Sequence, residues 1–201
     1  MRAHLDGPAT RRTGNGEPAV RGRAARLVRG RVLAALLALL VPVLVLANIG
    51  LPFSAAGIKE ISGGVGILDL EPRDSAEGVR QALDAYGEEG RERYLLLLAT
   101  LDVLLPLLFA LTCALVLAMT LGRAARWLWA VPAAGMVADY AENVVLVILL
   151  TGHPSPGPAG LMPALTAVKS AAVMTDLLLV GVGLVYAAVR RIARSRSRAA
   201  R

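Results

Sequence analysis

Four long apolar blocks dominate the pattern of hydrophobic and polar positions along this chain. They cover residues 32–50, 94–121, 127–150 and 162–189, and polar or charged segments separate them. A helix needs about 20 mostly apolar residues to cross the hydrocarbon core of a bilayer. Since each block is about that long or longer, the sequence predicts an all-α, polytopic membrane protein built as a four-transmembrane-helix bundle.

The first block has a second interpretation. The small residues Ser54, Ala55 and Ala56 follow it, as small residues follow the apolar region of a cleaved signal peptide. However, 31 residues precede the block, which is far longer than the basic region that opens a signal peptide. We therefore expect the block to remain in the protein as a spanning helix.

The charged residues indicate an orientation in the membrane. The chain has a formal net charge of +7, with basic residues concentrated in residues 1–31, at Arg123 and Arg126, and in residues 190–201. Bases thus occupy every second segment between the apolar blocks, which is the positive-inside pattern. We expect an inner (plasma) membrane protein with both termini in the cytoplasm, residues 1–30 forming a disordered basic tail and residues 190–201 a second basic tail. This distribution accounts for the positive charge without a nucleic-acid partner.

The segment of residues 51–93 is too long for a simple connector and is predicted to form an outer loop. Asp74 and Glu77 have the spacing of a capping box, with Asp74 as the N-cap. After them, three apolar residues recur at helical spacing before a glycine that suits a helix end: Val79, Leu83, Tyr86 and then Gly87. The sequence therefore predicts a short amphipathic helix over the outer mouth of the bundle.

Polar side chains interrupt three of the apolar blocks: Asp102, Asp139, Glu142, Asn143, Lys169 and Asp176. Each ionisable group costs about 2.5–3.5 kcal/mol at the centre of a spanning helix, so these groups should face the bundle interior and find partners. Counted from the outer ends of the blocks at the rise of an α-helix, four of them lie about 10–12 Å deep: Asp102, Glu142, Asn143 and Lys169. Asp139 and Asp176 are expected to form a deeper layer.

Two features favour a reactive site over simple pairing at this place. Pro106 cannot donate a hydrogen bond to the carbonyl of Asp102, and a freed carbonyl in lipid needs another partner or water, which predicts a polar cavity. Four carboxyls also face a single ammonium, so full ionisation would leave three negative charges in excess. The alternative is that these groups only pair with one another to hold the helices together.

The same positions resemble a known group of proteins. They comprise Gly90-Arg91 with Tyr94, Asp102 with Pro106, Asp139-x-x-Glu142-Asn143, and Thr166-x-x-Lys169. Together they resemble an uncharacterised group of small bacterial four-helix integral membrane proteins, over roughly residues 50–190. The resemblance implies the four-helix architecture and the importance of these residues, and it implies no reaction.

Three functions are compatible with these features. The leading hypothesis is a membrane-embedded acid–base enzyme, such as an isomerase or cyclase, acting on an isoprenoid or another lipid. In it Glu142 or Asp139 is the acid, Asp102 is its partner, and Lys169 and Asn143 orient them, with Asp176 as a further candidate. The alternatives are a non-catalytic assembly subunit and a proton- or cation-coupled transporter.

No cofactor and no metal is expected. Cys113 is the single cysteine, so no thiol pair or cysteine-based zinc site can form. Membrane lipids and a lipophilic small molecule are the expected partners, and a homo-oligomer is left open.

Overall fold

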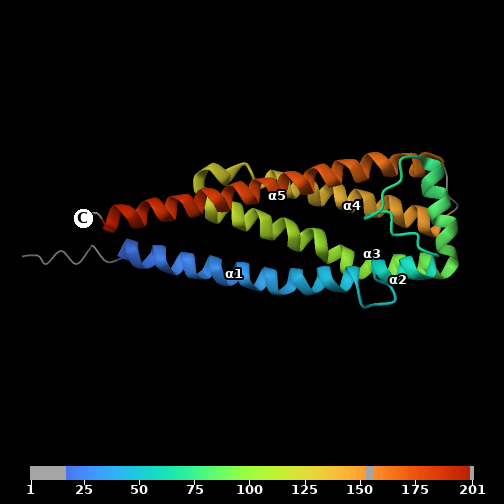
Figure 1. The fold of residues 1–201 in the computed structure, drawn as a ribbon, viewed down its shortest axis with the longest axis horizontal. Coiled ribbons are helices and arrows are strands. Elements are labelled where there is room, and N and C mark those ends of the chain that lie inside the picture. The colour runs from blue at the N-terminus through green and yellow to red at the C-terminus, as the bar shows by residue number, and fades with distance from the viewer. Residues whose placement is uncertain (1–16, 153–155, 200–201) are drawn as a thin grey trace, which may run out of the picture.

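The computed structural model describes residues 17–152 and 156–199, which form six helices and no strand. Four of these helices are long and apolar enough to cross a membrane. They run lengthwise beside one another (Figure 1), which confirms the predicted all-α four-transmembrane-helix bundle. The elements in chain order are α1 (Glu17–Asn48), α2 (Ala55–Ile61), α3 (Ala76–Leu121), η1 (Gly122–Arg126), α4 (Ala130–Thr151) and α5 (Pro156–Ala199).

Helices α1 and α5 extend beyond the apolar blocks that predicted them. Helix α1 already begins at Glu17, and α5 continues to Ala199, so residues 17–30 and 190–199 are helical although tails were expected there. The rest of both predicted tails, residues 1–16 and 200–201, lies outside the described residues. Arginine and alanine have high helix propensity, and an existing helix gains one hydrogen bond for each residue added. The polar segments therefore continue the helices that the apolar blocks begin.

One end of the bundle is covered by α2, by residues 62–75 and by the first part of α3; we call it the capped end. The first part of α3, residues 76–86, lies across this end of the bundle (Figure 1). At Gly87 the backbone leaves the helical region, with φ 61° and ψ −166°, and the chain turns into the bundle. Val79, Leu83 and Tyr86 are buried. The predicted amphipathic helix and its end at Gly87 are thus confirmed.

The start of α3 differs from the prediction by one residue. Ser75 is the N-cap, and its hydroxyl accepts a hydrogen bond from the N–H of Gly78 at 3.1 Å. The assignment of Asp74 as the N-cap was therefore wrong. Serine and aspartate cap helices about equally well, so the residue types alone do not decide between these neighbours.

The largest apolar core lies near the capped end and joins α3, α4 and α5. Its fully buried residues include Tyr94 of α3, Leu146 of α4 and Met162 of α5. Helix α1, in contrast, contacts α2 and α3 but neither α4 nor α5 within the described residues. Most of its large apolar side chains are exposed, as expected of a helix that faces lipid on most sides. The opposite end holds η1, the start of α1 and the end of α5; we call it the arginine end.

Gly87 provides a test of the turn that directs α3 into the bundle. Gly87→Ala should lower the free energy of unfolding by about 1–3 kcal/mol, because this backbone conformation is essentially restricted to glycine. No atom lies within 4 Å of the added Cβ, so the loss would come from the backbone alone. Unfolding of the purified protein in detergent measures it.

Gly181→Ala is the matched control. Gly181 lies inside α5, and its added Cβ also meets nothing within 4 Å. Alanine is the better helix former, so stability should stay the same or rise slightly. Equal losses in the two variants would contradict the role assigned to Gly87.

Candidate functional site

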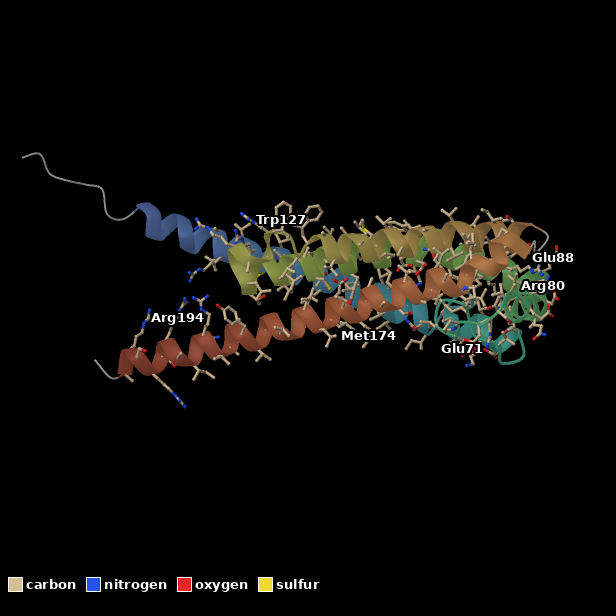
Figure 2. All side chains as sticks on the ribbon, turned by 90° about the horizontal axis from the view of Figure 1, so that it is seen from above. Glu71, Arg80, Glu88, Trp127, Met174 and Arg194 are labelled. Atoms are coloured by element: carbon tan, nitrogen blue, oxygen red, sulfur yellow. The ribbon has the colours of Figure 1, made fainter. Side chains whose placement is uncertain are left out.

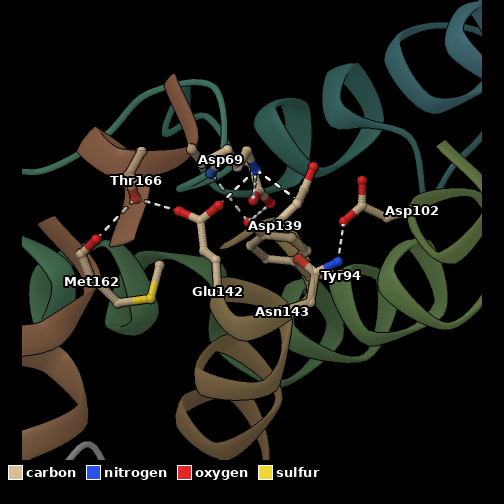
Figure 3. Close-up of polar contacts among 9 residues, drawn as sticks. Asp69, Tyr94, Asp102, Asp139, Glu142, Asn143, Met162 and Thr166 are labelled. Atoms are coloured by element: carbon tan, nitrogen blue, oxygen red, sulfur yellow. Dashed lines mark hydrogen bonds and ion pairs between the residues drawn. The ribbon is translucent and has the colours of Figure 1, made fainter. Parts of the chain in front are cut away.

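The ammonium of Lys169, on α5, lies among three carboxylates from three different parts of the chain. Its Nζ is 2.8 Å from Oδ1 of Asp69, 3.2 Å from Oδ1 of Asp139 and 2.6 Å from Oε2 of Glu142 (Figure 3). Only the contact with Asp69 has the geometry of a hydrogen bond; the contacts with the two α4 residues are ion pairs. We call these four residues the Lys169 centre.

The Lys169 centre is almost closed to solvent. The Glu142 side chain is 0% exposed, and the side chains of Asp69, Asp139 and Lys169 are 8%, 12% and 14% exposed. One ammonium faces three carboxylates, so full ionisation would leave two surplus negative charges in a poorly hydrated place. Buried charge is costly unless it is paired and hydrogen-bonded. The centre is therefore suited to hold a proton, or to exchange one with a neighbouring group.

Hydroxyl groups hold two of the carboxylates in place. Thr166, one helical turn before Lys169, donates to Oε1 of Glu142, and its hydroxyl also lies 3.0 Å from the carbonyl of Met162. Tyr94 of α3 donates to Oδ2 of Asp69 at 2.6 Å. The same phenol oxygen accepts the backbone N–H of Asp69 at 3.4 Å. Because Tyr94 is fully buried, it fixes the Asp69 turn against the spanning helices.

Asp69 was not among the residues predicted from the sequence. It lies outside every helix, in the segment between α2 and α3. The signal that could have identified it is its position in a short apolar run between α2 and α3, where Ile67 and Leu68 are both buried. An acid within such a run either points outward or meets a partner beneath the run.

The segment that carries Asp69 is braced on both sides. Glu71 forms an ion pair with Lys59 of α2 and accepts the N–H of Gly66 at 3.2 Å. The hydrogen bond from Lys59 holds the pKa of Glu71 below its usual value. Tyr86 donates to the carbonyl of Gly66 at 2.8 Å. Contacts among α2, residues 62–75 and the first part of α3, which together we call the cap, thus hold the segment around Asp69 in position.

A second polar pair lies beside the centre. Nδ2 of Asn143 donates to Oδ2 of Asp102 at 2.8 Å, which joins α4 to α3. Asp102 is half-buried, and within the described chain it forms no ion pair with Lys169. The hydroxyl of Tyr140 donates to the carbonyl of Val103, next to the carbonyl that Pro106 frees. The polar cavity expected beside Asp102 stays a prediction.

Asp176 lies apart from these groups. Its side chain is buried, and its Oδ1 has no hydrogen-bond partner among the described residues. A Cβ added at Gly135 of α4 would lie 3.6 Å from its Oδ2, so the glycine provides space for the carboxyl. Asp139, which was expected in the same deeper layer, pairs with Lys169 instead. The count along the helices put Asp139 four residues deeper than Lys169, which corresponds to about 6 Å. The four-carbon stem of the lysine side chain spans this distance, so the two groups meet.

The carboxylates of the centre have the arrangement of a cation site. One oxygen from each of Asp69, Asp139 and Glu142 lies within 4.8 Å of the other two. Oxygen ligands at this spacing suit a hard cation. In this structure the Lys169 ammonium lies among them, so the protein supplies the positive charge itself.

No protein-family model, curated protein or solved structure matched this chain in the comparisons made. The likeness to small four-helix membrane proteins therefore stays a prediction. Seven of the ten positions that carry it belong to the contacts described above: Tyr94, Asp102, Asp139, Glu142, Asn143, Thr166 and Lys169. Gly90, Arg91 and Pro106 do not, and Arg91 contacts Leu83 and Asp84 instead.

Removal of the ammonium tests the electrostatic balance of the site. Lys169→Met should lower the free energy of unfolding by about 3–5 kcal/mol, the range typical when one partner of a buried ion pair is lost. Adding Asp139→Asn should recover part of that loss, because it removes one of the unpaired negative charges. Unfolding in detergent measures both variants.

Lys59→Met serves as the control, since it also removes a lysine from an ion pair, but at the exposed cap. It should change stability little, because exposed ion pairs are screened by water. If Lys169→Met were as well tolerated as Lys59→Met, the ammonium would not be balancing buried charge.

Proposed function

We propose that this integral membrane protein is an enzyme that carries out acid–base chemistry on a lipophilic substrate, an isoprenoid or another lipid. The observation that supports the proposal is the Lys169 centre, where three buried carboxylates share one ammonium. A fourth carboxyl, Asp102, lies outside the contacts of that ammonium. Neighbouring carboxyls in different surroundings suit the separate roles of proton donor and proton acceptor.

In this proposal Asp102 is the proton donor. Its Oδ2 accepts from the neutral amide of Asn143, and its other oxygen points away from that amide (Figure 3). Oδ1 can therefore carry the proton. Because Asp102 is half-buried, it can meet a substrate, whereas Glu142 is fully enclosed and cannot. We therefore assign the role of proton donor to Asp102, although the sequence led us to expect Glu142 or Asp139 in that role.

Asp139 is the proposed proton acceptor, and the other groups position it. Its side chain is buried but keeps 12% of its surface exposed, whereas that of Glu142 keeps none, and the ion pair with Lys169 favours its charged form. Asp69 and Glu142 keep the ammonium in place. Asp176 has no part in this proposal.

The reaction is an isomerisation initiated by a proton. The π electrons of a substrate alkene form a C–H bond with the proton of Asp102, which leaves a carbocation on the neighbouring carbon. The surrounding carboxylates stabilise that charge. Loss of a proton from an adjacent carbon to Asp139 then forms the shifted double bond. Transfer of a proton from Asp139 back to Asp102 through water completes the cycle without a net change in the enzyme.

The proposal includes an orientation. The distribution of basic residues favours a cytoplasmic arginine end, in an inner (plasma) membrane, and an outward-facing capped end. The Lys169 centre would then lie below the outer face of the bilayer.

A second candidate is a purely structural role in a membrane assembly. It is favoured by the way the centre joins the segment before α3 to α3, α4 and α5. A transport role draws on the cation-site spacing of the three carboxylates. Only the enzymatic proposal includes the formation and cleavage of C–H bonds in a lipid; the structural and transport roles do not.

Deuterium incorporation tests the enzymatic proposal and does not require that the substrate be identified first. The purified protein is reconstituted with an isoprenoid-containing membrane lipid extract in D₂O, and the lipids are analysed by mass spectrometry. Protonation of an alkene leaves a deuteron bonded to carbon, so a lipid species should gain deuterium over time. Asp102→Asn should slow this gain by about 10²–10⁴-fold, the usual contribution of a general acid.

Asp74→Asn is the control for the same chemical change at an exposed position of the cap, and it should leave the rate unchanged. If wild-type protein gave no deuterated lipid, or if a folded Asp102→Asn variant kept the wild-type rate, the enzymatic proposal would fail. A loss of thermal stability in Asp102→Asn and Glu142→Gln, without any deuterated product, would favour the structural role.

A further inference from the structure

A cavity of about 1360 Å³ opens at the arginine end, between α1 and α5. Its wall is formed by α1, the end of α3, η1 and the last turns of α5. Helices α1 and α5 make no contact with each other within the described residues, and Figure 2 shows them apart at this end. The cavity is therefore a wedge between two spanning helices, at the opposite end from the Lys169 centre.

Arginines from three elements converge on this cavity. Arg26 and Arg29 come from α1 and Arg123 from η1. Helix α5 adds four of the five arginines in residues 190–198, and Arg194 lies on the side of α5 that faces α1 (Figure 2). No acidic residue is among the described residues that line the cavity. A positive-inside signal requires basic residues at this end, but it does not require them to line one cavity.

The chemistry of the lining suits phosphate. The planar guanidinium group donates two parallel hydrogen bonds to a phosphate and is the preferred partner of such anions. Seven arginines around one cavity repel one another unless an anion enters it. A single phosphate would contact only some of them, and the volume exceeds what one phosphate fills.

The deeper part of the lining is apolar. Ala118, Met119 and Leu121 of α3 and Ala187 of α5 lie beside the basic residues. The cavity thus combines a basic rim with an apolar wall on spanning helices, as the headgroup and chains of a lipid require. Basic pockets between membrane helices bind anionic lipid headgroups by the same physical means.

We propose that the cavity between α1 and α5 binds a membrane lipid whose headgroup carries two phosphate groups. The phosphates contact arginines of both helices, and the acyl chains extend along the gap between them. The lipid bridges two helices that make no contact with each other in the described part of the chain. This site is independent of the proposed enzymatic function.

Native mass spectrometry of the full-length protein in detergent tests this site. The protein is titrated with tetraoleoyl cardiolipin, which has two phosphates, and separately with dioleoyl phosphatidylglycerol, which has one. Wild-type protein should bind cardiolipin about tenfold more tightly or better, since each additional charged contact is worth roughly that factor. Inorganic pyrophosphate is added as a competitor, in order to distinguish a lipid site from a site for a free anion.

Two double variants with the same loss of charge provide the comparison. R29Q/R194Q removes one arginine that lines the cavity from each of α1 and α5. R31Q/R196Q also removes one arginine from each of these helices, but neither of these two arginines lines the cavity. The first should weaken cardiolipin binding by about tenfold or more, and the second should stay within about twofold of wild type. Circular dichroism and thermal unfolding confirm that both are folded, and the single variants R194Q and R196Q repeat the comparison if a double variant is unstable.

Three results would overturn the proposal. Equal losses in the two double variants would indicate general attraction to basic residues. Equal affinity of the wild type for the two lipids would refute recognition of two phosphates. Displacement of cardiolipin by equimolar pyrophosphate would assign the cavity to a free anion.

Discussion

A charge inside a membrane must be compensated within the protein, and in this bundle one ammonium compensates carboxylates from several elements at once. Lys169 contacts Asp69 from the cap and both Asp139 and Glu142 from α4. The relative positions of α4, α5 and the cap are therefore linked through a single nitrogen atom. Apolar packing between membrane helices is weakly directional, because lipid is as apolar as the side chains it replaces. Polar contacts of this kind specify which helix faces meet.

Much of the fold could be predicted from the sequence, because two lengths are constant. The thickness of the hydrocarbon core sets the length of an apolar block, and the rise of the helix converts residue numbers into depth. Counting residues put Asn143 level with Asp102 and Glu142 level with Lys169, and the two side chains of each pair are in contact in the structure. The burial cost of ionisable groups then requires such residues to face one another. The length of a spanning helix and the burial cost of its ionisable groups do not depend on the segments that connect the helices.

Other parts of the site could not be predicted, for physical reasons that differ from residue to residue. Asp69 lies in an irregular segment, where no helical period relates sequence position to direction. Asp176 shares the spacing of the other acids, but among the described residues its Oδ1 has no hydrogen-bond partner, and the residue of α4 that faces it is Gly135, which has no side chain. The pairing of Asp139 with Lys169 depended on the reach of a flexible side chain. Spacing along a helix predicts a face, while pairing depends on the lengths and surroundings of the side chains.

The position of Asp69 has a consequence for how the protein is made. Spanning helices can enter the bilayer one after another and associate afterwards. During that stage Lys169, Asp139 and Glu142 are already in place on their helices, whereas Asp69 belongs to a polypeptide segment outside them. The last negative charge reaches the ammonium only when this segment settles onto the bundle and Tyr94 binds it. Docking of the cap and completion of the buried ionic cluster are consequently coupled, because the contact between Asp69 and Lys169 requires this segment to lie on the bundle.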